Sequence, residues 1–437
     1  MHMGKSDISE CSGCSGCSDC LDSPGFGGWL TGRAPWYAWA VAGAVLAAAV
    51  VNAARRTRAG GMDNAIVVEA ARTWLEGGSP YDDPHFLYLP SAVLAAVPQA
   101  LLPLSASRAL VPLAVVCLLV AGWACALRVH GVACRSRFAV LGITGLALGF
   151  APFKHLVLLG NWTVTAAAAL PFALLLAARG RWTGAGLVIG AAVAVKPLLA
   201  PMLLLFLFAR RWRGAAAVVL VPALASGCAA LLMPDPAGFF TRTLPFLLGG
   251  HDDFVRLYEA SLVAVLPRLG VPQAAATVLG LAAAAGGVWG AYRRWRGAGP
   301  EPLRLVESAV LLMLSAFLVS RPSYDHYLLV VVPLLLAGVL LPGSAARRPG
   351  FWIALVPQVP GFTWPYVEAT TRRAFRDSFT LCALVVTLVT AAVATGPGRG
   401  GTLVPGGRPR ATPRFDPSGP ARVFCQFVMC IGLLILT

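Results

Sequence analysis

The sequence predicts an all-α integral membrane protein, a polytopic helical bundle of roughly ten to twelve membrane segments. Hydrophobic residues make up 57% of the chain, the mean hydropathy is +0.73, and charged residues make up only 12%. An ordinary soluble domain carries about 25% charged residues. A soluble protein of 437 residues could not cover its surface with so little charge. We therefore expect a lipid bilayer to cover most of the surface.

The net charge of +16 is distributed along the chain and does not form one basic patch. Lys and Arg occur in short clusters between apolar runs, at 179–181, 210–213, 293–296 and 347–348. Cytoplasmic loops carry such clusters under the positive-inside rule. Because nucleic-acid binding requires the cations to share one water-facing surface, we do not expect a nucleic-acid partner.

Long apolar runs supply the candidate membrane segments. A helix needs about 20 apolar residues to cross the hydrocarbon of a bilayer, and about 17 at the short end. The candidate segments are 36–53, 108–127, 138–153, 161–178, 183–209, 215–233, 271–291, 303–319, 327–342, 350–366 and 378–396. They define one transmembrane domain over 36–396. The first run lacks the layout of a cleavable signal peptide, so we expect an uncleaved anchor.

The two ends of the chain are predicted to be cytoplasmic tails. Residues 1–35 are rich in Cys, Ser and Gly and are expected to be disordered, and 397–437 are rich in Gly, Pro and Arg. The first tail contains Cys11, Cys14, Cys17 and Cys20. This spacing differs from that of iron–sulfur and zinc sites, so we interpret these cysteines as part of the tail. The apolar run 424–436 is too short to span a membrane.

Two long loops, about 54–107 and 234–270, fall on the same side of the membrane by alternation of the segments. The basic clusters alternate with them, which places the long loops outside the cell. Arg55, Arg56 and Arg58 alone would place the first loop inside. Four downstream clusters outweigh this one, so we expect a plasma-membrane protein whose site faces the extracytoplasmic side.

The first outer loop is predicted to contain interfacial helices. In 64–76 the apolar residues Ile66, Val67, Ala70 and Trp74 recur at helical spacing. A helix this short and amphipathic is expected to lie in the interface. A second apolar stretch, 86–103, is interrupted by two prolines and could dip into the bilayer.

The segment 183–209 has two interpretations. Basic residues flank both of its ends, and Lys196-Pro197 lies in its middle. Two half-helices meeting at Lys196 would keep both basic loops on one side, as broken helices do where they line a cavity. A single kinked span would place these loops on opposite sides.

Ionisable residues within or against the membrane are costly and therefore mark candidate sites. The candidates are Asp63, His85, Tyr88, Lys196, Asp235, Arg242, His251, Asp252, Asp253, Arg321, Tyr324, Asp325 and His326. Each also has a structural interpretation, for example a helix cap for Asp63 or a snorkelling side chain for Lys196. What favours a site is that one carboxylate and several cations map to the same outer face.

This set of residues suits sugar transfer from a polyprenyl phosphate. Lys or Arg would bind the phosphate and stabilise it as it leaves. A carboxylate would take the proton from the incoming hydroxyl. Only one phosphate leaves, and no DxD-type carboxylate pair is evident. We therefore expect no cofactor, although a divalent metal ion stays compatible with the sequence.

Several strings, in this order, resemble the family 87 glycosyltransferases of the GT-C superfamily. They are GGSPYDDPHFLYLPSAVL, LLGNWTV, AVKPLLAPMLLLFLFARRWRGA, DPAGFFTRTLPFLLG and RPSYDHYLLVVVP, and they follow an Asp after the first span. The resemblance covers about residues 40–395. It is strongest to the arabinofuranosyltransferases of that family, although Met62 and Leu89 stand where their pattern has Asp and Pro.

The resemblance implies a GT-C fold and an inverting arabinofuranosyltransferase with Asp63 as the general base. The implied donor is a polyprenyl-phosphate arabinose, and the implied acceptor is a cell-wall arabinan or lipoglycan. The implied substrate-binding residues are His85, Tyr88, Asn161, Lys196, Arg242, Tyr324, Asp325 and His326. A mannosyltransferase of the same family and a transporter of lipid-linked sugars are the alternatives. Transporters often have paired broken helices, and the sequence indicates only one break.

Overall fold

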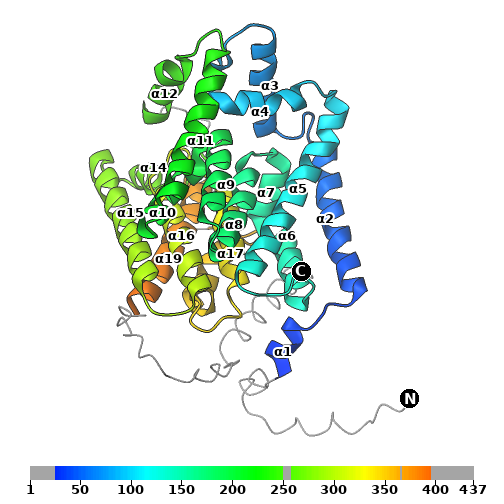
Figure 1. The fold of residues 1–437 in the computed structure, drawn as a ribbon, viewed down its shortest axis with the longest axis vertical. Coiled ribbons are helices and arrows are strands. Elements are labelled where there is room, and N and C mark those ends of the chain that lie inside the picture. Colours follow the sequence, from blue (N-terminus) through cyan, green and yellow to red (C-terminus); the bar gives the residue numbers. More distant parts are fainter. Residues whose placement is uncertain (1–24, 250–256, 365–366, 395–437) are drawn as a thin grey trace.

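The computed structural model describes residues 25–249, 257–364 and 367–394. Within these ranges the chain is helical and has no β-strand, only one isolated bridge between Arg33 and Ser136. The prediction of an all-α membrane bundle is confirmed (Figure 1). The cysteine cluster, the 424–436 run, His251, Asp252 and Asp253 lie outside the described residues. The end of the first predicted tail is ordered, since α1 (Gly25–Thr31) is a short helix.

Five helices of the described chain are long and apolar enough to cross a membrane. They are α2 (Trp36–Arg56), α5 (Leu104–Val129), α11 (Trp212–Leu231), α15 (Gln273–Arg296) and α19 (Ala369–Ala394). A sixth arises if α6 (Arg137–Gly149) and α7 (Ala151–Leu159), bent by 72°, count as one span. The other predicted segments are shorter helices: α8 (Thr163–Ala178), α9 (Trp182–Val195), α10 (Leu203–Phe208), α16 (Glu301–Phe317) and α17 (Leu328–Ala337).

Two expectations from the apolar runs need correction. The run 350–366 is no span, because α18 (Pro349–Leu355) has seven residues and gives way to a 3-10 turn at Val356–Gln358. Proline at 357 explains the change, since it removes a backbone donor from the helix. The bend between α6 and α7 is a second broken helix besides the one at Lys196. The sequence had indicated only one.

The segment 183–209 is a hairpin of two half-helices. α9 ends at Val195, Lys196 is extended, and a 3-10 turn (Pro197–Met202) leads into α10. Trp182, at the start of α9, contacts the ring of Phe206 at 5.8 Å and lies under the Arg211 guanidinium at 5.6 Å. The chain therefore returns to the end from which it started, and Lys196 occupies the tip. The residue before a proline is disfavoured in helical conformation, which explains the break.

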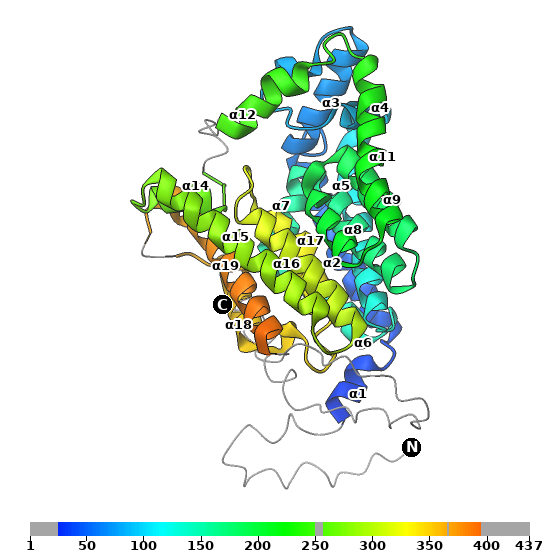
Figure 2. The same cartoon turned by 60° about the vertical axis from the view of Figure 1, so that its left-hand side comes forward.

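The predicted outer loop forms a helical cap at one end of the bundle. It contains α3 (Met62–Leu75), a 3-10 turn (Pro80–Asp82) and α4 (Pro90–Ala100). Figure 2 shows α3 and α4 at the end opposite to α1. The amphipathic pattern is confirmed as a helix, and its Val67 and Ala71 are fully buried. The Trp74 indole donates to the Leu232 carbonyl at 3.0 Å, which joins the cap to the end of α11.

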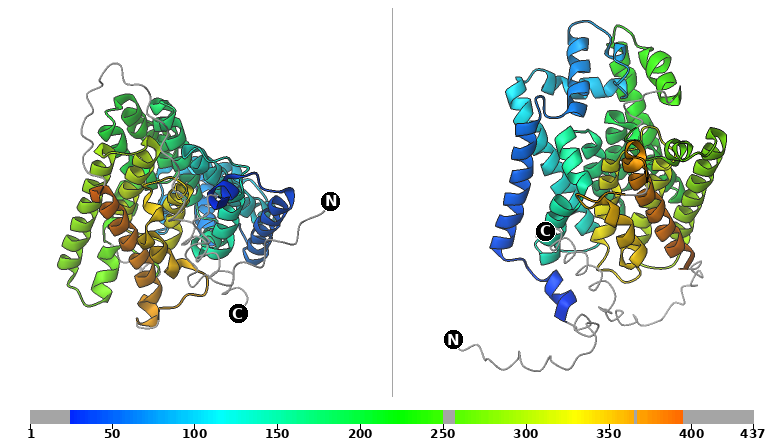
Figure 3. Two further views of the ribbon diagram at one scale, coloured as in Figure 1. Left: turned by 90° about the horizontal axis from the view of Figure 1, so that it is seen from below. Right: turned by 180° about the vertical axis from the view of Figure 1, so that it is seen from behind.

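The helix α17 (Leu328–Ala337) is buried along its whole length. All ten residues of α17 are buried, so it is the centre of the bundle. A 3-10 turn (Asp325–Tyr327) precedes it and is reached from α16. By contrast, α2 forms an outer edge of the bundle, as Figure 3 shows from behind. The remaining elements are α12 (Leu244–Gly249), α14 (Leu262–Arg268), a π-helical turn (Phe239–Thr243) and a 3-10 turn (Ala345–Arg347).

Candidate functional site

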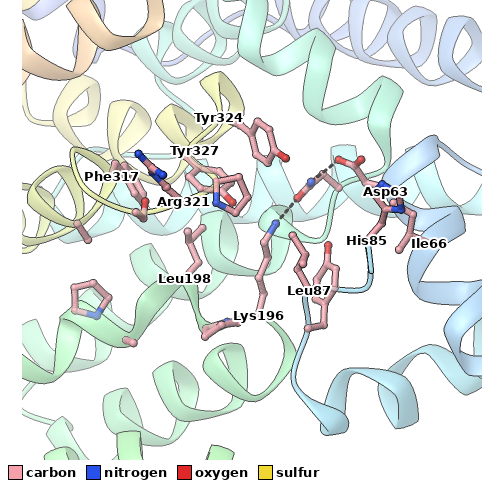
Figure 4. A pocket seen from close by; sticks show the side chains of 18 of the residues that line it. Asp63, Ile66, His85, Leu87, Lys196, Leu198, Phe317, Arg321, Tyr324 and Tyr327 are labelled. Carbon is pink, nitrogen blue, oxygen red and sulfur yellow. Dashed lines mark hydrogen bonds between the residues drawn. The ribbon is translucent and has the colours of Figure 1, made fainter. Parts of the chain in front are cut away.

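A cavity of about 660 Å³ lies beneath the helical cap. Five parts of the chain line it: the start of α3, the 83–88 loop, the α7–α8 junction at Asn161, the tip of the α9–α10 hairpin, and the α16–α17 junction. Figure 4 shows Asp63 and His85 at one end, Arg321 and Phe317 at the other, and Lys196 between them. Polar groups occur mainly near Asp63 and Lys196, and the hairpin tip and α16 add the apolar Leu198 and Phe317.

Glycines bring the start of α3 against the end of α7. Gly60, Gly61 and Gly160 all have positive φ, of 78°, 121° and 60°. A Cβ on Gly160 would lie 2.1 Å from the Gly60 carbonyl oxygen, and one on Gly61 would lie 2.2 Å from the Leu159 backbone. Only glycine allows both the conformation and this approach. The contact places residues 63 and 161 within reach of each other.

Two adjacent side-chain pairs hold this junction. The Asn161 amide donates from Nδ2 to Asp63 Oδ2 at 2.5 Å. Beside it, the Trp162 indole donates to Asn64 Oδ1 at 3.0 Å. No side-chain cap is formed at the start of α3, where Gly61 is the N-cap residue. Asp63 is therefore not the helix cap that its position also suggested, and its half-buried carboxylate lines the cavity.

Asn161 also holds Lys196. The Lys196 ammonium donates to Asn161 Oδ1 at 3.0 Å and to Thr163 Oγ1 at 2.9 Å. Asn161 Oδ1 accepts a further bond from the Thr163 backbone N–H at 2.7 Å. One amide thus connects a carboxylate to an ammonium without a direct contact between them. Among the described residues no carboxylate forms an ion pair with Lys196, so its charge is available to an anion in the cavity.

Aromatic rings surround the ammonium group. Lys196 Nζ lies 5.5 Å from the centre of the Tyr88 ring and 5.3 Å from that of Tyr327. These distances allow cation–π attraction between the ammonium and both rings. Tyr88 stacks on Phe86 at 5.6 Å, and burial raises the pKa of its phenol well above the usual value. Tyr88 is therefore neutral and offers a ring face and a hydroxyl.

The 80–85 loop adds a second carboxylate to the cavity. His85 donates its backbone N–H to Asp83 Oδ1 at 2.9 Å, and its ring Nδ1 lies 3.0 Å from the same oxygen. Both side chains are exposed and line the cavity mouth. Tyr81 anchors the loop, because it is buried against Phe86 at 5.5 Å. Burial also raises the pKa of the Tyr81 phenol.

Arg242 does not reach the cavity. Its guanidinium pairs with Asp82 and, at 2.7 Å, with Asp235. These contacts join the 3-10 turn that follows α3 to the loop that follows α11. The structure therefore gives Arg242 a position that fixes the loop carrying Asp83 and His85.

Asp325 and His326 lie behind the wall of the cavity, and of the Tyr324–His326 set only Tyr324 lines it. Asp325 Oδ2 lies 2.5 Å from His155 Nδ1 and accepts from Arg373 at 3.1 Å. His326 stacks on the Tyr324 ring, with centres 5.2 Å apart. Both side chains are buried and have no face on the cavity, and His326 contacts its wall through the Tyr324 ring.

The sequence did not single out Asp83 and Tyr327, which line the cavity, or Thr163, which lies behind the lining and contacts Lys196. It did single out Arg321 as a candidate, but without a role. Arg321 donates to the Val263 carbonyl at 2.8 Å and is the second cation of the cavity. Thr163 was within a recognised motif, two residues after Asn161, and Tyr327 within another. Sequence spacing alone gives no sign that these two side chains converge on one ammonium.

Within the described residues no group of three or more His, Cys, Asp or Glu side chains is placed to hold a metal ion. The absence of a cofactor stays an expectation. The cavity itself offers two carboxylates, an ammonium, a guanidinium and an apolar stretch.

Comparisons with known proteins agree on one family. The model of glycosyltransferase family 87 matches residues 86–320. Over 282 residues the chain is 33% identical to an alpha-(1->3)-arabinofuranosyltransferase of Mycobacterium tuberculosis, an alignment that covers 63% of each chain. It is 31% identical to the protein of the same name from Mycolicibacterium smegmatis, covering 62% of this chain and 63% of the relative. The match thus spans under two thirds of these relatives. No solved structure matches the chain.

Proposed function

The chain belongs to glycosyltransferase family 87, and from that premise we propose that it is a membrane arabinofuranosyltransferase. Its donor would be a polyprenyl-phosphate arabinose. Its acceptor would be an arabinan of the cell wall, in arabinogalactan or lipoarabinomannan. The names of the relatives support arabinose as the transferred sugar. The observation that carries the proposal is that Asp63 and Lys196 line one cavity and are joined through Asn161.

Asp63 acts as the general base in this proposal. Its carboxylate takes the proton of an acceptor hydroxyl while that oxygen attacks the anomeric carbon of the sugar. The bond from the anomeric carbon to the phosphate oxygen breaks, and the electron pair leaves with the polyprenyl phosphate. A single displacement inverts the configuration at the anomeric carbon. The Asn161 bond keeps one Asp63 oxygen occupied and leaves the other for the acceptor.

Lys196 and Arg321 serve the leaving phosphate. The phosphate gains negative charge as the bond breaks, and a fixed cation stabilises that charge. Lys196 has three donors, of which Asn161 and Thr163 use two, so one remains for a phosphate oxygen. Arg321 lies at the far end of the same cavity (Figure 4). The apolar Leu198 and Phe317 also line the cavity and suit a prenyl chain that enters from lipid.

Membranes containing the chain would test the sugar and the reaction together. Radiolabelled arabinosyl and mannosyl lipid phosphates are supplied separately with an arabinan oligosaccharide. We expect label in the acceptor only with the arabinosyl donor, and none when Asp63 is replaced by Asn. Transfer of mannose alone would assign the chain to the mannosyl branch. Movement of the lipid-linked sugar across the membrane without any transfer would contradict an enzyme and favour a transporter.

A further inference from the structure

A second cavity, of about 800 Å³, lies at the start of α2. Its polar lining consists of Arg33, Arg135 and Arg137, and Trp36 and Trp39 add aromatic rings. The helix α2 has 21 residues and runs from this cavity to the loop that carries Gly60. At 1.5 Å per residue it separates the two cavities by roughly 30 Å. The second cavity is therefore at the opposite end of the bundle from Asp63, and Figure 1 shows α1 and the start of α2 at that end.

Backbone hydrogen bonds fix the arginines side by side. Arg33 and Ser136 form an antiparallel bridge. The Ala34 N–H donates to the Arg135 carbonyl at 2.8 Å, and the Arg137 N–H donates to the Gly32 carbonyl at 2.9 Å. The bridge holds two stretches that are 100 residues apart in sequence, so the cations do not depend on a flexible loop to meet.

The positive charge of this cluster has no protein counterion in the described chain. No acidic residue lines the cavity, and none of the three arginines pairs with a carboxylate there. Arg137 instead stacks on the Trp29 ring at 5.0 Å and donates to the Trp29 carbonyl at 3.0 Å. Both contacts leave its charge uncompensated. Three neighbouring cations around one cavity favour an anionic ligand.

The aromatic side chains place the cavity at the level of the lipid headgroups. Trp36 is 80% exposed and Tyr37 61%, at the first residues of an apolar helix long enough to span a bilayer. Exposed Trp and Tyr at the end of such a helix are typical of the membrane–water interface. An anion that reaches these arginines from the bilayer is therefore the headgroup of a lipid.

We propose that this cavity binds an anionic phospholipid of the leaflet opposite to the Asp63 cavity. Arg33, Arg135 and Arg137 hold the phosphate, and the acyl chains lie along Trp36 and Trp39 on the exposed face of α2. This lipid is not a substrate, and the proposal is independent of sugar transfer. Its chemistry is that of a diacyl phosphate ester with net negative charge, such as phosphatidylglycerol.

The purified full-length chain, released from nanodiscs of mixed phosphatidylglycerol and phosphatidylcholine, would test the site by native mass spectrometry. We expect retained phosphatidylglycerol and little phosphatidylcholine on the wild type. The double variant Arg33→Gln with Arg135→Gln removes two charges but no hydrogen bond that the structure records for those side chains. One cation near an anionic headgroup is worth about fivefold in affinity. The double variant is thus expected to bind phosphatidylglycerol about 25-fold more weakly.

Arg181→Gln with Arg213→Gln is the matched control. These two exposed arginines flank the hairpin at the same end of the bundle and lie outside the cavity. Equal loss of lipid in this control would overturn the site, because only net charge would then matter. Unchanged retention in the Arg33 and Arg135 variant would overturn it as well. If inorganic phosphate displaced the lipid at millimolar concentration, the cavity would be a site for a soluble anion. Unfolding temperatures in phosphatidylcholine alone verify that both variants are folded.

Discussion

Asn161 and Asp63, 98 residues apart in sequence, share a hydrogen bond of 2.5 Å, and both line the cavity. The same Asn161 amide accepts from Lys196 through its oxygen. The Asn161 oxygen is thus used by protein donors, and one of the two Nδ2 hydrogens is used by Asp63, while the side chain also lines the cavity. Its predicted contact with substrate stays a prediction. We propose in addition that Asn161 sets the positions of Asp63 and Lys196.

Replacing Asn161 by Ala tests this positioning role. The change removes the bond to Asp63 and the bond to Lys196 together. A hydrogen bond to a charged group is worth about 1.5–3 kcal/mol, so kcat is expected to fall by roughly 10- to 100-fold. Single-turnover transfer from the arabinosyl lipid phosphate would measure it.

The control for Asn161 is Thr163→Val. Thr163 shares only the Lys196 contact, so this variant leaves the bond between Asn161 and Asp63 in place. We expect Thr163→Val to lower kcat less than Asn161→Ala does. We expect it to raise the donor KM, because the Lys196 contact is lost in both variants. Equal losses of kcat in both variants would show that Asn161 acts through Lys196 alone.

Asp63→Asn tests the general base. Asparagine keeps the size of the side chain and an oxygen that accepts from Asn161, but it cannot take a proton. Transfer is expected to fall at least about 100-fold, the low end of general-base contributions. Circular dichroism and the unfolding temperature should match those of the wild type.

Asp83→Asn is the matched control, since Asp83 is the other carboxylate that lines the cavity. It is exposed and contacts His85, so it is held by a surface loop rather than by the α3–α7 junction. We expect a much smaller loss than for Asp63. If Asp83→Asn lost most of the transfer activity while Asp63→Asn kept near-normal transfer, Asp83 would be the general base and Asp63 would not.

Lys196→Met tests the phosphate contact. Methionine fills similar space without charge, so the donor KM is expected to rise more than the acceptor KM. The same substitution at Lys154, an exposed residue of α7 outside the cavity, is the control and should leave both constants near the wild-type values. If the donor KM of Lys196→Met is unchanged, Lys196 does not bind the phosphate, and its role is to stabilise the hairpin tip through Asn161 and Thr163.

Local sequence patterns predicted the helices more accurately than they predicted which residues line the cavity. The amphipathic 64–76 pattern predicted the helix α3. The residue type and its neighbours in sequence suffice for such an inference. For 183–209 the sequence left a hairpin and a single kinked span open, and the structure has the hairpin with Lys196 at its tip. The sequence did not predict that Arg242 pairs with Asp82 and Asp235 outside the cavity, because these partners come from two separate parts of the chain. Asp325 and His326 were grouped with Tyr324 by adjacency, but Tyr324, just before the 3-10 turn, and Tyr327, at its end, line the cavity, whereas Asp325 and His326 do not.

Two further differences between the predicted and the observed helices lie where a proline ends or breaks a helix. Run length alone suggested a span at 350–366, whereas the described chain there bends after seven helical residues. The break between α6 and α7 lies at Phe150, which is extended, and Pro152 in the first turn of α7 removes the backbone donor that a continuous helix would need there. The contact of Gly160 with the loop before α3 is a separate feature, and no local pattern reveals it. That contact brings Asp63 and Asn161 together, so the candidate site depends on a tertiary contact between glycines.

The orientation of the bundle decides whether the Asp63 cavity faces outside, and cysteine labelling can measure it. The basic clusters place Asp63 outside, whereas Arg55, Arg56 and Arg58 alone argue for inside. Glu76, at the end of α3, and Arg213, in a basic cluster at the opposite end, are both exposed and suit single cysteines. In a background whose other accessible cysteines are replaced, Glu76→Cys should react with a membrane-impermeant maleimide in intact cells. Arg213→Cys should react only after the cells are permeabilised. The reverse pattern would place the cavity in the cytoplasm and remove the basis for an extracytoplasmic acceptor.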